Sequence, residues 1–310
     1  MNSRQIIADA WNFTREHMQL MWWYAFIPSL VNTLVGILYM VYQFFAFKRS
    51  ELFDNAPQSF LTEVIKTVLS FLNQHANLWI PFVVVTIIVL VLYLLLPTLC
   101  QGALIQIIAK KRQGAEARAL DGIALGLLVF LPLLEYHLLV NGFSMFSVFT
   151  EAAFVLRNLG TVAMTTLLPV FVIATLIAFI LTLLFTYADF FIVLRRVPIL
   201  KAIGKSAKLV VVSWQHTFII AILMLIIGLR VIINIVAVLL VPALLLLGAS
   251  FFAVTAFTKI SIIISAIVAV IGLLVASYFT GILNLFANTV WTYTFLALME
   301  EKKTQELMEE

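Results

Sequence analysis

The 310-residue sequence has little charge and almost no cysteine. Charged residues make up 11% of the chain, whereas 64% of the residues are hydrophobic. A soluble domain usually carries about 25% charged residues. A chain of this composition cannot cover a folded surface with polar groups, which excludes a soluble globular protein. Intrinsic disorder is also excluded, because so many Phe, Leu, Ile and Val residues would not stay hydrated. An integral membrane protein remains.

The common signatures of enzymes and metal sites are missing as well. The single cysteine, Cys100, excludes an intrachain disulfide and a zinc thiolate cluster. The sequence contains no His-Glu-x-x-His, no phosphate-binding loop and no Gly-x-Gly-x-x-Gly. We therefore predict no catalytic, cofactor-binding or metal-binding residues and no enzymatic activity. The net charge of +4 fits basic loops beside a membrane better than nucleic acid, which is not an expected partner.

Six apolar stretches are long enough to cross a bilayer, which takes roughly 20 residues of helix. Nothing alternates in the manner of a membrane β-strand. The fold class predicted is therefore all-α: a polytopic integral membrane protein with six transmembrane helices, forming one domain over residues 1–310. Several stretches exceed the ~30 Å hydrocarbon core and must tilt, kink or project from it. The predicted spans are about 22–45, 78–109, 123–142, 160–194, 214–247 and 260–299.

The distribution of basic residues predicts the orientation. Six crossings put both termini on one side, and cytoplasmic segments are enriched in Lys and Arg. With the termini inside, thirteen of the 19 basic residues fall in cytoplasmic segments and five in outer ones. We therefore expect a cytoplasmic (plasma) membrane protein with both termini in the cytoplasm. The span at 123–142 is the weakest, because Pro132, Glu135 and His137 interrupt it. The basic runs 110–112 and 195–196 are both expected in the cytoplasm, so an even number of crossings must separate them. This requirement favours the span at 123–142.

The segment Pro198–Ser213 is predicted to form an amphipathic helix on the membrane surface. Lys201, Lys205 and Lys208 fall within about 60° of one another on a helical wheel, opposite Ile199, Ile203 and Val210. These lysines are candidate contacts to lipid headgroups.

A weak repeat suggests how the spans are organised. Ala10, Thr14 and Trp22 align with Ala202, Ser206 and Trp214 at an offset of 192 residues. We infer an organisation of three helical hairpins, each entered from a cytoplasmic amphipathic segment. The outer segment 55–77 is also amphipathic.

One motif resembles a known group of proteins. A basic turn after a span is followed by a helix of the form Ala-x-x-x-Ser-x-x-Leu, here Ala202, Ser206 and Leu209, and then by Trp214 and another span. This resembles the membrane domain attached to some bacterial glycerophosphodiester phosphodiesterases and the YciC-like multi-pass proteins. The family usually has an acidic residue shortly before that helix, where this chain has Arg195-Arg196-Val197. The resemblance implies a bacterial multi-pass membrane protein without assigned chemistry, and it transfers no catalytic residue.

Ionisable residues inside a span are costly, so each one is a candidate for function. Glu135 and Arg230 lie at similar depths in their predicted spans, and we predict that they form an intramembrane charge pair. Glu135 and His137 are two residues apart, so their side chains point about 160° apart around a helix and suit no shared metal. Asp189, near the cytoplasmic end of its span, is expected to reach interfacial water.

The sixth span is predicted to be the helix most buried in protein. Its small and polar residues occupy an arc of about 100°, continued at its edge by two asparagines. Small residues let helix backbones approach closely in lipid. The candidate helix-packing face is Ser261, Ser265, Ala269, Gly272, Ala276, Thr280, Asn284 and Asn288. Gly122 and Gly126 form a Gly-x-x-x-Gly, which is a further packing signal.

These patterns favour a structural, scaffolding or interaction component of the membrane. Its expected partners are the lipid bilayer and another membrane protein or a second copy of the chain, and no cofactor is expected. A transporter or permease-like subunit is one alternative; it would need Glu135, Arg230 and the polar residues of the sixth span to face one cavity. A lipid-modifying intramembrane enzyme is the other; it would need an acid, base or nucleophile cluster at the cytoplasmic interface, where Asp189 is the only candidate.

Overall fold

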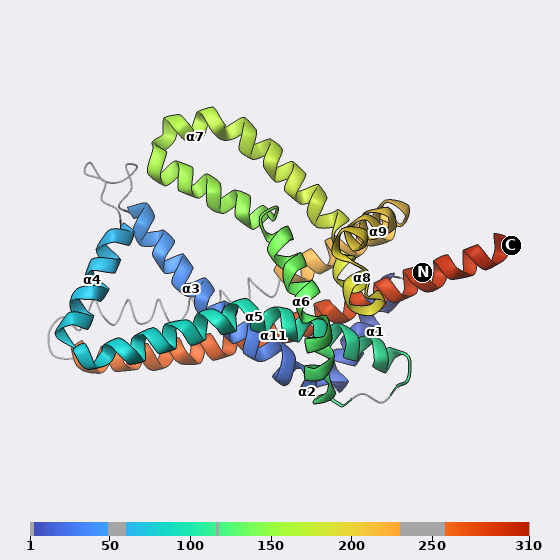
Figure 1. Ribbon diagram of the computed structural model, residues 1–310, viewed down its shortest axis with the longest axis horizontal. Coiled ribbons are helices and arrows are strands. Elements are labelled where there is room, and N and C mark those ends of the chain that lie inside the picture. Colours follow the sequence, from blue (N-terminus) through green and yellow to red (C-terminus); the bar gives the residue numbers. More distant parts are fainter. Residues whose placement is uncertain (1–2, 49–59, 116–117, 230–257, 310) are drawn as a thin grey trace. The chain divides into compact units, whose positions relative to one another are not determined.

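The computed structural model describes residues 3–48, 60–115, 118–229 and 258–309. Every regular element in these ranges is helical, which confirms the all-helical prediction (Figure 1). The elements are α1 (Ser3–Glu16), α2 (Met18–Leu20), η1 (Met21–Phe26), α3 (Ile27–Lys48), α4 (Phe60–Gln74), η2 (Ala76–Leu78), α5 (Trp79–Arg112), α6 (Asp121–Asn141), α7 (Met145–Leu184), α8 (Ala188–Arg195), α9 (Ile199–Val212) and α11 (Thr258–Glu309), with a further helix at Trp214–Leu229.

Five described helical segments are long and apolar enough to cross a membrane. A sixth is obtained if α9 and the helix Trp214–Leu229, which meet at 95°, are counted together. The predicted span 214–247 is described only as far as Leu229. The other predicted spans agree with the observed segments to within a few residues, except the fourth and the last. The five segments are Met18–Lys48, Ala76–Arg112, Asp121–Asn141, Met145–Arg195 and Val270–Glu301. Insertion and orientation in a bilayer stay predictions.

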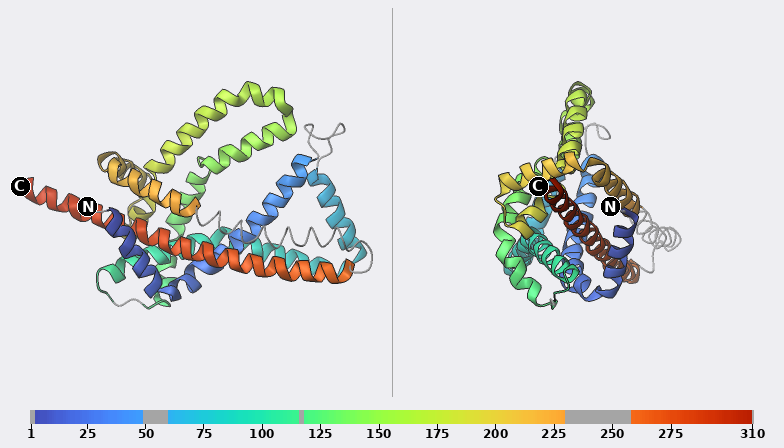
Figure 2. Two further views of the ribbon diagram at one scale, coloured as in Figure 1. Left: turned by 180° about the vertical axis from the view of Figure 1, so that it is seen from behind. Right: turned by 90° about the vertical axis from the view of Figure 1, so that its right-hand side faces the viewer.

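The fourth segment is longer than predicted because α7 consists of two arms that meet at Gly160. Gly160 has φ 76° and ψ −178°, a backbone conformation open to glycine but costly for other residues. The predicted span begins at this break, and the helix Met145–Leu159 precedes it. The chain folds back on itself at the break (Figures 1 and 2). The arm after Gly160 is about 36 Å long, enough to span a hydrocarbon core.

By its contacts the chain forms two compact units. The first comprises residues 1–34, 99–128 and 212–310, and the second comprises residues 35–98 and 129–211. The helices α3, α5 and α6 therefore each contribute to both units.

The first unit is held together around the C-terminal part of α11. Helix α11 contacts α1 and η1, and Ala10, Ile220, Phe286 and Val290 form a buried apolar cluster. In the same unit, nearly every side chain of α5 from Ala103 to Ala109 is buried. These residues pack as in the interior of a folded protein.

The part of α5 in the second unit is different. Its apolar side chains from Phe82 to Leu95 are almost all exposed, on every side of the helix. A helix that is hydrophobic all round is stable only where its surroundings are apolar. From Trp79 to Leu96 it is about 27 Å long, close to the thickness of a hydrocarbon core. This exposure pattern suits a lipid-facing segment.

Candidate functional site

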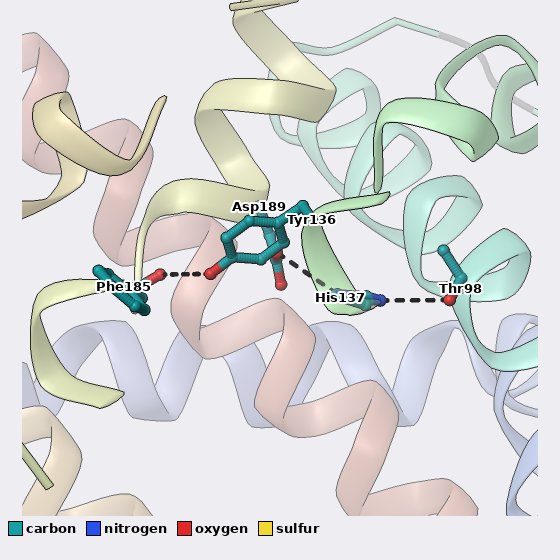
Figure 3. A network of polar contacts seen from close by, with 5 residues as sticks. All are labelled: Thr98, Tyr136, His137, Phe185 and Asp189. Atoms are coloured by element: carbon teal, nitrogen blue, oxygen red, sulfur yellow. Dashed lines mark hydrogen bonds and ion pairs between the residues drawn. The ribbon is translucent and has the colours of Figure 1, made fainter. Parts of the chain in front are cut away.

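The second unit contains a network of polar contacts between helices α5, α6, α7 and α8 (Figure 3). Thr98 lies on α5, Tyr136 and His137 lie on α6, Phe185 ends α7, and Asp189 lies in the first turn of α8. The sequence places Thr98, His137 and Asp189 far apart along the chain, and the fold brings them together. This network is the candidate site.

His137 is the central residue of the network. Its Nδ1 lies 3.2 Å from the Thr98 hydroxyl oxygen, and its Nε2 lies 3.5 Å from Oδ1 of Asp189. The side chains of His137 and Asp189 are 23% and 18% exposed. An imidazole with a carboxylate on one nitrogen and a hydroxyl on the other has both ring nitrogens engaged. The ring is thereby fixed between α5 and α8.

The α7–α8 junction, residues Phe185–Tyr187, explains why polar side chains gather here. A helix end leaves backbone groups without intrahelical partners. The Tyr136 hydroxyl donates to the carbonyl of Phe185 at 3.2 Å. The Ser206 hydroxyl donates to the carbonyl of Leu184 at 2.6 Å and accepts from the Tyr187 N–H at 3.0 Å. Side chains from α6 and α9 therefore supply hydrogen-bond partners to the backbone groups of the junction.

The same contacts give a physical account of the Ala-x-x-x-Ser-x-x-Leu motif. Ala202, Ser206 and Leu209 are buried on one face of α9, and Ala202 and Ser206 are fully buried. The small residues Ala202 and Ser206 allow α9 to approach the α7–α8 junction closely, and the Ser206 hydroxyl supplies a hydrogen-bond partner to the backbone of the junction. Ala10 and Thr14, their counterparts in the proposed repeat, are buried in the same way in the first unit. The family resemblance itself stays a prediction.

The chemistry available to the network is limited by burial. A hydroxyl, an imidazole and a carboxylate in a row form the arrangement used in nucleophilic catalysis. Thr98, however, is only 4% exposed and lies within α5, one residue after Pro97. A substrate cannot approach its oxygen without opening the helix packing. Among the described residues, no three His, Cys, Asp or Glu side chains come together as a metal site. The network is suited to joining helices.

The predicted charge pair is described only at one partner. Glu135 is exposed on α6, about 100° around the helix from the buried Tyr136, whereas Arg230 lies outside the described residues. The pair therefore stays a prediction. Leu131 and Leu138, one turn before and after Glu135, are 61% and 63% exposed. Glu135 thus interrupts an apolar surface.

The predicted headgroup contacts lie on the surface of the second unit. Lys201, Lys205 and Lys208 are all exposed on α9, and Arg195 and Arg196 just before it are exposed as well. The helix predicted here is present, and its position at a membrane interface stays a prediction.

The predicted packing face of the sixth span is described in part. The side chains of Ser261, Ser265 and Ala269 lie outside the described residues. Ala276 is buried and Gly272 and Thr280 are half-buried, while Ile271 and Leu274 across the helix are exposed. The assignment of the whole face stays a prediction.

The asparagines of this face are engaged in the first unit. Asn284 Nδ2 donates to the Ser29 hydroxyl at 2.9 Å, and Asn288 Nδ2 donates to the Asn284 carbonyl at 2.8 Å. At the neighbouring Gly281, a Cβ would lie 3.2 Å from Cα of Phe26. The helices therefore approach closely at this glycine.

Sequence reasoning missed the contact between His137 and Asp189. The sequence pattern indicates interfacial water for Asp189 and relates His137 only to Glu135. The sequence does contain a signal for the contact, because His137 and Asp189 are both ionisable residues in apolar segments. Nothing in the sequence fixed which helices are neighbours.

Replacing Ser206 with Ala is expected to destabilise the second unit by about 1–2 kcal/mol. The change removes the two hydrogen bonds that the Ser206 hydroxyl makes at a buried position, to the Leu184 carbonyl and from the Tyr187 N–H. Chemical unfolding of the purified protein in mixed micelles measures the effect. Thr165→Ala is the matched control, because its exposed hydroxyl bonds only within α7. Equal stability of the two variants would contradict the role assigned to Ser206.

Comparisons with protein-family models, with curated proteins and with solved structures find no match to this chain.

Proposed function

We propose that the protein is a structural and interaction component of a cytoplasmic membrane, which acts by binding another membrane protein. One observation carries the proposal. Glu135 is exposed on α6 between the exposed side chains of Leu131 and Leu138. It lies about 6 Å from the midpoint of a helix long enough to span the bilayer. A carboxylate at this depth costs free energy unless a partner neutralises it.

The partner that fits this surface is a transmembrane helix with an Arg or Lys at the depth of Glu135. Leucines around the carboxylate would pack against lipid-facing side chains of that helix, and the cation would pair with Glu135. Arg230 is the alternative source of the cation, within the same chain.

The roles of the other polar residues support this proposal over catalysis or transport. Ser206, Tyr136 and His137 each contact a neighbouring helix, as does Asn284. Side chains used in this way stabilise a helical framework. A transport path or a reaction would instead draw polar groups toward a common space open to substrate.

Site-specific photocrosslinking tests the proposal in membranes of the cells that make the protein. Benzoylphenylalanine at Leu131 or at Leu138 is expected to give a discrete adduct with another protein. At Val172, an exposed apolar position on α7, it is expected to give none. Glu135→Leu should reduce the Leu138 adduct more than tenfold, because truncating one partner of a buried charge pair costs several kcal/mol.

Two results would overturn the proposal. One is labelling of lipid alone at Leu131 and Leu138, with no protein adduct. The other is an adduct confined to the same chain and lost in Arg230→Gln, which would establish the intrachain pair instead.

We further propose that both termini lie in the cytoplasm, as the distribution of basic residues indicates. In a Cys100→Ala background, Thr62→Cys on α4 should react with an impermeant thiol reagent on whole cells. Lys205→Cys on α9 should react only after permeabilisation. Thr62 and Lys205 are both exposed and can react with the reagent. A cysteine at the neighbouring Ser206 would be buried and would not be labelled from either side of the membrane. The opposite labelling pattern would reverse the orientation.

A further inference from the structure

The segment Arg195–Val211, called here the α8–α9 elbow, carries an unusual concentration of positive charge. Arg195, Arg196, Lys201, Lys205 and Lys208 are all exposed. Asp189, six residues before Arg195, contacts His137, and no further Asp or Glu follows in the sequence before Glu300. Exposed cations at this density attract an anionic surface.

Helix α9 divides into three longitudinal strips. Ala202, Ser206 and Leu209 form the buried strip against the second unit. The three lysines form a strip about 100° away around the helix axis. A third strip contains Leu200 and Val211, which are 79% and 65% exposed and lie three turns apart on the same side, within about 20°.

This order of strips is the one expected for a helix lying in the plane of a membrane. Exposed apolar residues enter the boundary between headgroups and acyl chains, while lysines beside them extend to the headgroup phosphates. A water-facing helix would gain nothing from two large apolar side chains held this far from the protein. The apolar strip and the lysine strip therefore indicate a single kind of surface, a bilayer that carries negative charge.

The buried strip holds the elbow in a defined position. The Ser206 hydroxyl bonds to the backbone on both sides of the α7–α8 junction. Arg196 has a left-handed backbone conformation, with φ 50°, where the chain turns from α8 toward α9. The cations are thus presented by a fixed element of the fold, which lowers the entropy lost when a headgroup binds.

We infer that the α8–α9 elbow is a binding site for anionic phospholipid headgroups. The inference concerns a lipid ligand and does not depend on the protein partner proposed for α6. Phosphatidylglycerol supplies both the negative charge and the acyl chains that the strips match, whereas phosphatidylcholine supplies the acyl chains without net charge.

Thermal unfolding of the purified full-length protein in a neutral detergent tests the site. Added phosphatidylglycerol is expected to raise the unfolding temperature, and phosphatidylcholine or inorganic phosphate at the same concentration is not. In the triple variant Lys201→Gln, Lys205→Gln, Lys208→Gln, the phosphatidylglycerol concentration for half-maximal stabilisation should rise about a hundredfold, or roughly fivefold for each lysine. The corresponding Lys→Arg variant should behave as the wild type.

The matched control removes the same charge elsewhere, in Lys66→Gln, Lys110→Gln, Lys111→Gln, and should keep the wild-type response. The single variant Lys205→Gln, expected to change about fivefold, keeps the test decisive if the triple variant folds poorly. Equal stabilisation by phosphatidylcholine, or an equal loss in the control, would overturn the site. Stabilisation by inorganic phosphate would identify a free anion in place of a lipid.

Discussion

Gly126→Ala is expected to destabilise the first unit by about 2–3 kcal/mol, in the upper part of the range for overpacking a helix contact. A Cβ at Gly126 would lie 2.6 Å from the backbone oxygen of Leu99 and 3.2 Å from Cβ of Ala103. The Leu99 oxygen belongs to the backbone of α5 and has no rotamer by which to move away. The hairpin of α5 and α6 must therefore separate, and the hydrogen bond from Gln106 Nε2 to the Leu125 carbonyl, at 2.8 Å, is strained with it.

Unfolding of the purified protein by denaturant in mixed micelles measures this loss. Gly36→Ala is the matched control, because it lies within α3 and a Cβ there would have nothing within 4 Å. It should be neutral or stabilising by about 0.5–1 kcal/mol, since alanine is the better helix former. A Gly126 variant as stable as the Gly36 variant would show that α5 and α6 are not in close contact.

These two glycines show what a short motif can and cannot predict. The Gly-x-x-x-Gly spacing of Gly122 and Gly126 indicated a packing surface, and both glycines do face close neighbours. The Gly-x-x-x-Gly spacing did not predict which helix packs against this surface. Gly126 faces the backbone of α5, whereas Gly122 faces the side chains of Ile107 and Tyr24.

Helices were predictable because the signal for them is local. An apolar run of about 20 residues has few other stable conformations in a bilayer. The ends of α5 and α6 lie within three residues of their predicted positions for this reason. The same signal placed the start of the fourth span at Gly160 but missed the helix Met145–Leu159 before it, where Glu151 and Arg157 interrupt the apolar run.

The polar network was not predictable because it depends on which helices are neighbours. Ser206 appeared in the sequence as part of a degenerate motif, and its partners are backbone groups that no side-chain pattern reports. His137 and Asp189 lie on helices separated by the whole of α7. The sequence indicates how far along its helix each polar residue lies, but the packing of the helices determines which neighbour its side chain contacts.

Removal of either side chain of the His137–Asp189 contact is expected to cost about 2–3 kcal/mol, since the remaining polar group loses this contact in a mostly buried place. In His137→Ala, Asp189 loses its contact to Nε2, and the Thr98 hydroxyl loses Nδ1. In Asp189→Ala, the imidazole keeps only Thr98 of these two partners.

The double variant His137→Ala, Asp189→Ala should be more stable than the sum of the two losses predicts, by about 1–2 kcal/mol, because the loss of the His137–Asp189 contact is counted in both single variants but occurs only once. Denaturant unfolding of the four proteins in mixed micelles gives this coupling free energy directly. Glu135→Gln is the control on the same helix and should change the free energy of unfolding of the isolated protein by less than about 0.5 kcal/mol, since Glu135 is exposed there. Strictly additive losses would mean that His137 and Asp189 contribute independently, and that the network does not join α6 to α8.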